Sequence, residues 1–149
     1  EGQRKIFIGA DHAGFNSKET LKKYLKDLGF FVEDMGNLAL DPNDDYPDFI
    51  IPVARAVAKN IGSRGIVIGG SGQGEAIAAN KIQGIRAAVV YDEYSAKMSR
   101  IDNDANVASF GARATDIEKI KELTMLWLDT PFSKETRHKR RVEKISGIN

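Results

Sequence analysis

The chain alternates strand-like and helix-like segments from one end to the other, and this alternation restricts its fold more than any other feature. Five short apolar segments are typical of strands: residues 5–9, 30–33, 65–69, 86–90 and 106–110. Helical spacing of apolar residues follows in residues 16–28, 48–60, 75–81, 92–101, 115–128 and 134–145. Strands joined by helical crossovers form a parallel sheet. We therefore expect an α/β three-layer sandwich, with helices on both faces of a five-stranded parallel sheet and a basic C-terminal helix.

Two helix starts carry the spacing of a capping box. Asn16 precedes Glu19 by three residues, and Thr115 precedes Glu118 by the same distance. We expect both pairs to cap their helices. One domain is enough for the 149 residues, since no linker or repeat divides them. We take it to cover residues 4–149 and set residues 1–3, which lack a Met, aside as a cloning remnant.

The composition excludes several functional classes. Without any Cys, the chain cannot form disulfides, thiolate metal sites or a Cys nucleophile. A formal net charge of +1 argues against a nucleic-acid partner. The longest apolar runs are strand-sized and no signal pattern opens the chain, so we expect no membrane span and a cytoplasmic location.

Basic residues gather near the C-terminal end of this nearly neutral chain. Residues 133–149 contain only two acidic residues, Glu135 and Glu143. The basic residues of this segment are Lys134, Arg137, Lys139, Arg140, Arg141 and Lys144. Such a compact basic segment suits a small anionic ligand better than a long polyanion. Arg137 and Arg141 are four residues apart, so a helix places both on one face, spaced to share a phosphate. A solvated basic face would have the same spacing.

A glycine-rich segment, residues 69–75 (GGSGQGE), directly follows the third strand. Its glycines let the backbone turn tightly and point N–H groups inward, and the next helix adds the positive end of its dipole. We expect Gly70, Gly72 and Gly74 to bind an anion, with the Ser71 hydroxyl as a catalytic donor to an oxyanion. That anion is either a phosphate or an enediolate. The segment lacks the P-loop and dinucleotide-binding fingerprints, and an ordinary strand-to-helix turn is the alternative.

Glu75 follows this loop and is our candidate base. Aldose–ketose isomerisation needs one base that moves a proton between adjacent carbons, together with donors that stabilise the enediolate. Partial burial beside the loop would raise the pKa of this carboxyl group toward that of a working base. A carboxylate at a helix start can also be only a favourable partner for the helix dipole.

Other candidates follow neighbouring strands, whose carboxyl ends meet at one edge of a parallel sheet. Asp11 and His12 could contact sugar hydroxyls or a ring oxygen, or only cap the local backbone. Arg113 follows the fifth strand and is a further anion-binding candidate. Residues 102–104 (Asp-Asn-Asp) resemble a carboxylate cluster, but no further ligand follows them. Because neither histidine lies in a metal-ligand cluster, we expect no metal.

Seven motifs, in the same order along nearly the whole chain, resemble those of the B-type ribose-5-phosphate isomerases and the related galactose-6-phosphate and allose-6-phosphate isomerases. They are Asp11-His12-Ala13-Gly14, Asp45-Tyr46-Pro47, Gly69-Gly70-Ser71-Gly72, Ala78-Ala79-Asn80-Lys81, Gly84-Ile85-Arg86-Ala87, Asn103-Asp104-Ala105-Asn106 and the segment from Arg137-His138 to Arg141. The resemblance implies a Rossmann-like domain, no metal or other cofactor, and conversion of ribose 5-phosphate through a cis-enediolate. It also implies a homodimer with active sites shared between subunits, or a tetramer of two such dimers.

The resemblance also implies residue roles. One branch of the family uses a Cys after the third strand as its base, where this chain has Gly70. Gly74-Glu75 matches the other branch, in which the Glu is the base. The positions that hold substrate match Asp11, His12, Gly70, Ser71, Gly74, Asn103, Arg137 and Arg141, with the arginines reaching the phosphate across the dimer interface.

One position departs from the family pattern. The His assigned to opening the furanose ring is replaced by Asp102, and a carboxylic acid donates a proton well only if its pKa is raised. Either Asp102 is buried enough to serve, or His12 replaces it, or ring opening is slow. An isomerase for allose 6-phosphate or galactose 6-phosphate, or a non-catalytic sugar-phosphate-binding protein, is the alternative. A flavodoxin-like nucleotide-binding domain is disfavoured by the absent fingerprint.

Overall fold

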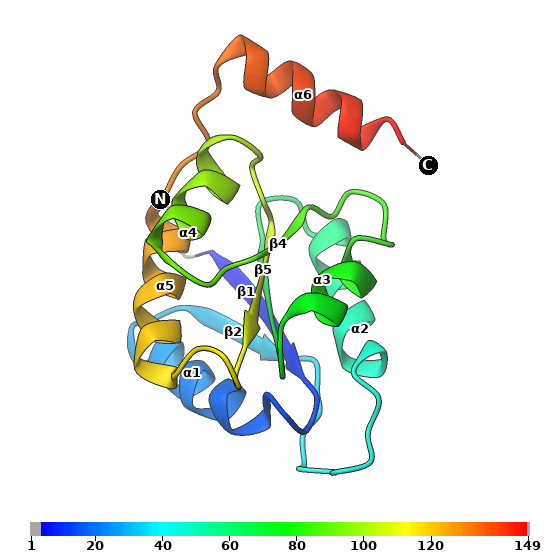
Figure 1. Cartoon of the computed structure of the whole chain (residues 1–149), viewed down its shortest axis with the longest axis vertical. Helices are drawn as coiled ribbons and strands as arrows, with labels where there is room; N and C mark the ends of the chain where they lie inside the picture. The colour runs from blue at the N-terminus through cyan, green and yellow to red at the C-terminus, as the bar shows by residue number, and fades with distance from the viewer. Residues whose placement is uncertain (1–3, 149) are drawn as a thin grey trace.

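Five parallel strands form one sheet in the order β2-β1-β3-β5-β4 (Figure 1). The computed structural model describes residues 4–148, so the residues set aside as a remnant and Asn149 lie outside the described part. The strands are β1 (Lys5–Ala10), β2 (Phe31–Asp34), β3 (Arg64–Gly69), β4 (Ala87–Val89) and β5 (Val107–Gly111). The expected α/β fold with a five-stranded parallel sheet is confirmed.

Six helices accompany the sheet within residues 4–148: α1 (Phe15–Asp27), α2 (Pro47–Lys59), α3 (Gln73–Ala79), α4 (Glu93–Ile101), α5 (Ile117–Asp129) and α6 (Thr136–Ser146). Helices α1, α4 and α5 cover one face, and α2 and α3 cover the other (Figure 1). Helix α6 lies beyond the sheet, at the end of the molecule opposite the strand arrowheads (Figure 1). None of these helices has the length and apolar character that crossing a bilayer requires.

The central strand β3 is buried along its whole length, because its side chains pack on both faces of the sheet. Ile66 and Ile68 join the cluster that contains Trp127 of α5, whereas Val67 joins the cluster that contains Val53 of α2. This alternation follows from the two-residue period of a strand. Burying an aliphatic side chain contributes about 1.5–3 kcal/mol, so both faces hold β3 firmly at the point where the glycine-rich loop begins.

The strand order reverses between β1 and β3, and such a reversal leaves a crevice at the carboxyl ends of the two strands. Gly14 lets the chain after β1 pass close to β3. A Cβ atom at Gly14 would lie 2.3 Å from the carbonyl oxygen of Ile68, far closer than any side chain tolerates. The glycine of the Asp-His-Ala-Gly motif is therefore required by backbone packing at the crevice.

Both capping-box predictions are wrong. Helix α1 begins after Gly14 without a side-chain cap, and Glu19 pairs with lysines of its own helix. Its N-cap is Gly14, two residues before Asn16, and the helix itself begins at Phe15. At α5 the cap is Asp116 rather than Thr115, and its carboxylate accepts a hydrogen bond from a backbone N–H three residues on, at 2.9 Å.

Candidate active site

A cleft of about 670 Å³ opens at the carboxyl edge of the sheet, where β1, β3 and β5 end. Its walls come from the segment after β1, the start of α2, the glycine-rich loop and the segment after β5. Of the residues predicted from the sequence, the cleft brings together Asp11, His12, Gly70, Ser71, Gly74, Glu75 and Arg113. The rule that parallel strands present their site at the carboxyl edge therefore located this group correctly.

The glycine-rich loop presents backbone donors to the cleft. Within residues 4–148, the N–H groups of Gly70, Ser71 and Gly74 have no protein acceptor, whereas the N–H of Gln73 donates to the Ser71 hydroxyl at 3.2 Å. Gly70 and Gly74 are closely covered, because a Cβ atom would lie 3.0 Å from an Arg113 nitrogen at the first and 2.6 Å from the Tyr46 hydroxyl oxygen at the second. The loop can therefore donate hydrogen bonds to an anion.

Gly72 differs from the other glycines of the loop. Its φ of +83° is left-handed, and it is buried with its α-carbon facing the backbone of Phe110 in β5. Its carbonyl accepts a hydrogen bond from the Ser109 hydroxyl at 2.7 Å. Gly72 shapes the turn and is absent from the cleft lining, and its contact with a ligand stays a prediction.

Glu75 lies in the first turn of α3 and is 4% exposed. Its carboxylate covers Gly69, since a Cβ atom there would lie 1.5 Å from Oε1. Within residues 4–148 its Oε2 has no hydrogen-bond partner. Burial raises the pKa of Glu75, and the charge of Asp11 raises it further. The hydrogen bond from the backbone N–H of Glu75 lowers it by less. A carboxylate with one unpaired oxygen and a raised pKa, beside a loop of backbone donors, is equipped to exchange a proton with a ligand.

Asp44 orients His12 at the other side of the cleft. Its Oδ1 lies 2.8 Å from Nδ1 of His12 and accepts the backbone N–H of the same residue at 3.1 Å. The hydrogen bond to Asp44 is the main reason that the pKa of His12 is raised, with the charge of Asp11 adding to it, against the effects of partial burial and of Arg113. A proton held on Nδ1 leaves Nε2 as the nitrogen that can act on a ligand.

Asp11 acts partly through the backbone. Its Oδ1 accepts the N–H groups of Ala13 and Gly14 at 3.0 and 3.3 Å, which is the local capping considered above. Asp11, His12 and Asp44 can also each place one ligand atom within 4.8 Å of the others. His12 therefore does lie in a group of possible metal ligands, contrary to what the sequence indicated, and the absence of a metal stays a prediction. In this group Asp44 orients the imidazole, whereas the Asp11 Oδ1 accepts backbone N–H groups.

Reasoning from the sequence did not single out Tyr46, which lines the cleft, or Asp44, which holds His12 from outside the lining. Both belong to a polar segment, residues 36–47, whose turn residues are typical of a surface loop. The motif Asp45-Tyr46-Pro47 contained the available signal for Tyr46. No local pattern pairs Asp44 with a residue 32 positions away.

The remaining predicted residues lie at the amino edge of the sheet: Asp102, Asn103, Arg137 and Arg141. Asn103 precedes β5 and lines a second cavity of about 420 Å³, together with Arg86 and Ile145. Helix α6 lies at the same end (Figure 1). Because β5 has five residues, about 16 Å of strand separates the two edges. One copy of the chain does not bring these residues to the cleft.

Asp102 pairs with His138, the one buried residue of α6. Its Oδ1 lies 3.4 Å from Nε2 of His138, whose Nδ1 lies 2.6 Å from the Ser133 hydroxyl. The side chain of Asp102 is 44% exposed, so it lacks the burial that would make it a proton donor. Arg137 and Arg141 are exposed on the same helix, and Arg137 pairs with Glu135.

Comparison with known proteins identifies the family. The profile of the ribose/galactose isomerase family matches residues 6–145. The chain belongs to this family. The membership confirms the expected reaction class, aldose–ketose isomerisation of a sugar phosphate.

Individual relatives resemble nearly the whole chain. Ribose-5-phosphate isomerase B of Escherichia coli is 41% identical over 145 residues, which cover 97% of this chain and 96% of that protein. D-erythrulose-4-phosphate isomerase 2 of Mycolicibacterium smegmatis is 39% identical over 143 residues, covering 95% and 94%. The structure of ribose-5-phosphate isomerase B from Mycoplasma genitalium with bound ribulose-5-phosphate superposes with a TM-score of 0.94 at 37% identity, covering 98% of this chain and 96% of that one.

Proposed function

We propose that this chain interconverts ribose 5-phosphate and ribulose 5-phosphate, with Glu75 as the base. The carrying observation is the buried carboxylate of Glu75, which has an unpaired oxygen beside a loop of backbone donors. The relatives named ribose-5-phosphate isomerase B support the substrate.

The residues of the cleft divide the proton transfer between them. Glu75 takes the proton from C2 of the open-chain aldose while the carbonyl oxygen on C1 becomes an oxyanion. The N–H groups of Gly70 and Ser71, with the Ser71 hydroxyl, stabilise the cis-enediolate. Glu75 then returns its proton to C1, and the hydroxyl proton on O2 passes to O1. One carboxylate therefore serves as base and acid in turn.

Ring opening must come before proton transfer when the sugar is a furanose. We assign this step to His12, because Asp44 holds its Nδ1 and keeps its pKa above the ordinary value, so that Nε2 can protonate the ring oxygen. Asp102 is the less suitable donor, because it is half exposed and paired with His138.

The phosphate needs more cations than one cleft supplies, and we propose that a second copy of the chain provides them. Arg113 lies in the cleft, whereas Arg137 and Arg141 lie on α6 at the opposite edge. Apart from His138, α6 buries no residue against its own chain, and it leaves Ile145 48% exposed. In a homodimer, α6 of one copy would close the cleft of the other. Assembly into tetramers and a cytoplasmic location remain predictions.

Glu75→Gln tests the assignment of the base. Because Gln has the same shape and cannot accept the proton, kcat for ribose 5-phosphate should fall by about a hundredfold to ten-thousandfold with KM nearly unchanged. Glu118→Gln is the matched control, since Glu118 also lies in a first turn but faces solvent at the start of α5. Turnover of Glu75→Gln near that of wild type would refute the assignment. A wild-type protein that is stabilised by the sugar phosphate but forms no ribulose 5-phosphate would be a binding protein.

A pair of substrates tests the ring-opening step and the sugar. Erythrose 4-phosphate cannot close a furanose ring, because its O4 carries the phosphate. His12→Gln should therefore slow ribose 5-phosphate more than erythrose 4-phosphate, and Asp102→Asn should affect both about equally. The opposite pattern would move ring opening to Asp102. Faster wild-type turnover of erythrose 4-phosphate, or of a hexose 6-phosphate, would replace ribose 5-phosphate as the substrate.

Mixing two inactive variants tests the shared site. If each cleft takes Glu75 from one copy and Arg141 from the other, a dimer of one Glu75→Gln chain and one Arg141→Ala chain has one cleft with both changes and one cleft with neither. Equal amounts, refolded together, should recover about a quarter of wild-type activity per chain. No recovery, with exchange of subunits demonstrated by mass spectrometry, would show that each cleft works with its own chain only.

A further inference from the structure

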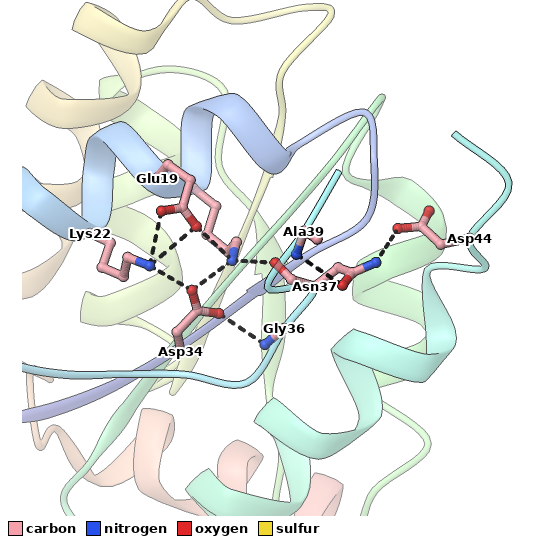
Figure 2. Close-up of polar contacts among 8 residues, drawn as sticks. Glu19, Lys22, Asp34, Gly36, Asn37, Ala39 and Asp44 are labelled. Atoms are coloured by element: carbon pink, nitrogen blue, oxygen red, sulfur yellow. Dashed lines mark hydrogen bonds and ion pairs between the residues drawn. The ribbon is translucent and has the colours of Figure 1, made fainter. Parts of the chain in front are cut away.

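Four charged side chains form a group outside the cleft, and none of the proposed steps uses them; Lys18 is buried and the other three are partly exposed. We call Lys18, Glu19, Lys22 and Asp34 the charge cluster, and Figure 2 labels the last three. The side chain of Lys18 is fully buried, and its Nζ lies 2.6 Å from Asp34 Oδ2 and 3.0 Å from Glu19 Oε1. Lys22 Nζ lies 2.8 Å from the same oxygen of Asp34. Although burial alone would raise the pKa of Asp34, the hydrogen bonds from both lysines hold it below its ordinary value.

Lys18 makes one contact that Lys22 lacks. Its Nζ also donates to the backbone carbonyl of Asn37 at 2.6 Å, which uses the last of its three N–H bonds. Asp34 accepts the backbone N–H of Gly36 at 2.9 Å. The peptide units of residues 36 and 37 are in turn bonded to Ala10 at the end of β1, at 2.9 and 2.8 Å. The charge cluster therefore fixes this backbone directly beside the strand that leads to Asp11 and His12.

The side chain of Asn37 extends these contacts to the cleft (Figure 2). Its Nδ2 donates to Asp44 Oδ2 at 3.2 Å, and its Oδ1 accepts the backbone N–H of Ala39 at 3.2 Å, which sets the direction of the amide. The other oxygen of Asp44 holds His12. Both oxygens of Asp44 are thus engaged, one by Asn37 and one by the imidazole.

We propose that Lys18 and Asn37 are positioning residues for His12. Lys18 holds the backbone of Asn37, the amide of Asn37 holds Asp44, and Asp44 presents the imidazole to the ligand with its proton on Nδ1. A fully buried ammonium group is stable only when it is paired, so the chain tolerates Lys18 there because its three N–H bonds all find acceptors. The role in turnover rests on the proposed function, whereas the effect on His12 does not.

The titration of His12 reports whether Asp44 stays in place. The charged groups that face the imidazole are Asp44, Asp11 at 4.0 Å from Nδ1, and Arg113. The two carboxylates raise the pKa of His12 and Arg113 lowers it, with the hydrogen bond to Asp44 contributing most. If Asp44 turns away, the pKa of His12 falls toward its ordinary value of 6.5.

Two variants and two matched controls test the proposal. Lys18→Met and Asn37→Ala each remove one contact of the series. Lys22→Met removes the other ammonium group from the same charge cluster without touching Asn37, and Asn43→Ala changes an exposed amide in the same loop. The chain has two histidines, so NMR resolves the ring signals, and His138→Gln assigns them. Ring chemical shifts against pH, circular dichroism and the pH profile of kcat/KM for ribose 5-phosphate are measured for each variant.

Lys18→Met and Asn37→Ala should lower the pKa of His12 and reduce kcat/KM about tenfold, with its pH profile shifted in the same direction. Both controls should titrate and turn over like wild type. Unchanged His12 titration in the folded variants, or an equal shift in Lys22→Met, would overturn the proposal. If Lys18→Met does not fold, Asn37→Ala decides the matter, since its backbone contacts remain. Absence of activity in the wild type would refute the proposed function and leave the titration result standing.

Discussion

Gly69→Ala should separate catalysis from stability in this protein. A Cβ atom at position 69 would lie 1.5 Å from Oε1 and 2.1 Å from Cδ of Glu75. An ordinary contact is about 3.4 Å, so the carboxylate must move by about 2 Å. Misplacing a reacting group by about 1 Å costs roughly a hundredfold in rate, and we therefore expect kcat to fall at least a hundredfold.

The same substitution should cost little stability. The overlapping atoms belong to the end of a flexible side chain, which can rotate away, and the φ angle of Gly69 is not left-handed. An off-rotamer side chain costs about 0.5–1.5 kcal/mol, so the melting temperature should fall by only a few degrees.

Gly65→Ala, in the same strand, is the matched control with the opposite outcome. Its Cβ atom would lie 2.9–3.0 Å from methyl groups of Val53, Val57 and Val107, which are packed in the core and cannot move away. Overpacking of this kind costs about 1–3 kcal/mol, while Glu75 is untouched. Steady-state kinetics and thermal denaturation of both variants give the comparison. If Gly69→Ala keeps kcat within about threefold of wild type while remaining folded, the carboxylate does not work from its place above Gly69.

Three further predictions concern stability. The pKa of Glu75 is raised in the folded protein, so ionisation of this carboxyl group destabilises the fold. The destabilisation grows as the pH rises from the ordinary pKa of 4.5 through the folded pKa. Glu75→Gln should therefore have a higher melting temperature than wild type at neutral pH, and the difference should disappear at acid pH. Arg64 is 8% exposed, with Nη1 unpartnered within residues 4–148 and its guanidinium 5.2 Å from the Trp127 ring. Burial, together with nearby arginines, lowers the pKa of Arg64 to about 9. Arg64→Met should therefore stabilise the protein by about 1 kcal/mol, measured by calorimetry. A lower melting temperature of the variant would mean that the contact with the Trp127 ring stabilises the fold more than burial of the charge destabilises it. Gly14→Ala should destabilise by about 3 kcal/mol in urea denaturation, because the clash is with the backbone of Ile68, and a loss below about 1 kcal/mol would contradict the close packing.

The sheet and one half of the site could be predicted because their signals are local. Apolar runs and helical spacing located every strand and helix to within a few residues. The carboxyl-edge rule then placed Asp11 and Glu75 together, although they are 64 positions apart, since each directly follows a strand or its loop. Gly72 was grouped with the other glycines of the loop because composition alone cannot distinguish a glycine that faces a cleft from one that faces the next strand.

Long-range pairs of polar side chains could not be predicted. Lys18 lies in a helix rich in lysine, where a solvated position is the ordinary expectation, yet it is fully buried against Asp34 and Asn37. Asp44 sits in a segment of turn residues whose composition is that of any surface loop. Such groups are buried or hydrogen-bonded because distant segments pack together, and local patterns in a single sequence do not predict that packing.

The division of the predicted residues between two edges of the sheet follows from charge as well as distance. In one copy the cleft is lined by the carboxylates Asp11 and Glu75 and by the basic residues His12 and Arg113, with Asp44 bonded to His12. The carboxylates offset the basic groups, so the lining carries no positive excess to attract a dianionic phosphate. Arg137 and Arg141 are exposed on a helix that buries only His138, and they would supply the missing positive charge if they came from a second copy. On this reasoning dilution to single chains should raise KM for the sugar phosphate before it lowers kcat, because the base and the loop donors stay within one chain while the phosphate loses its cations.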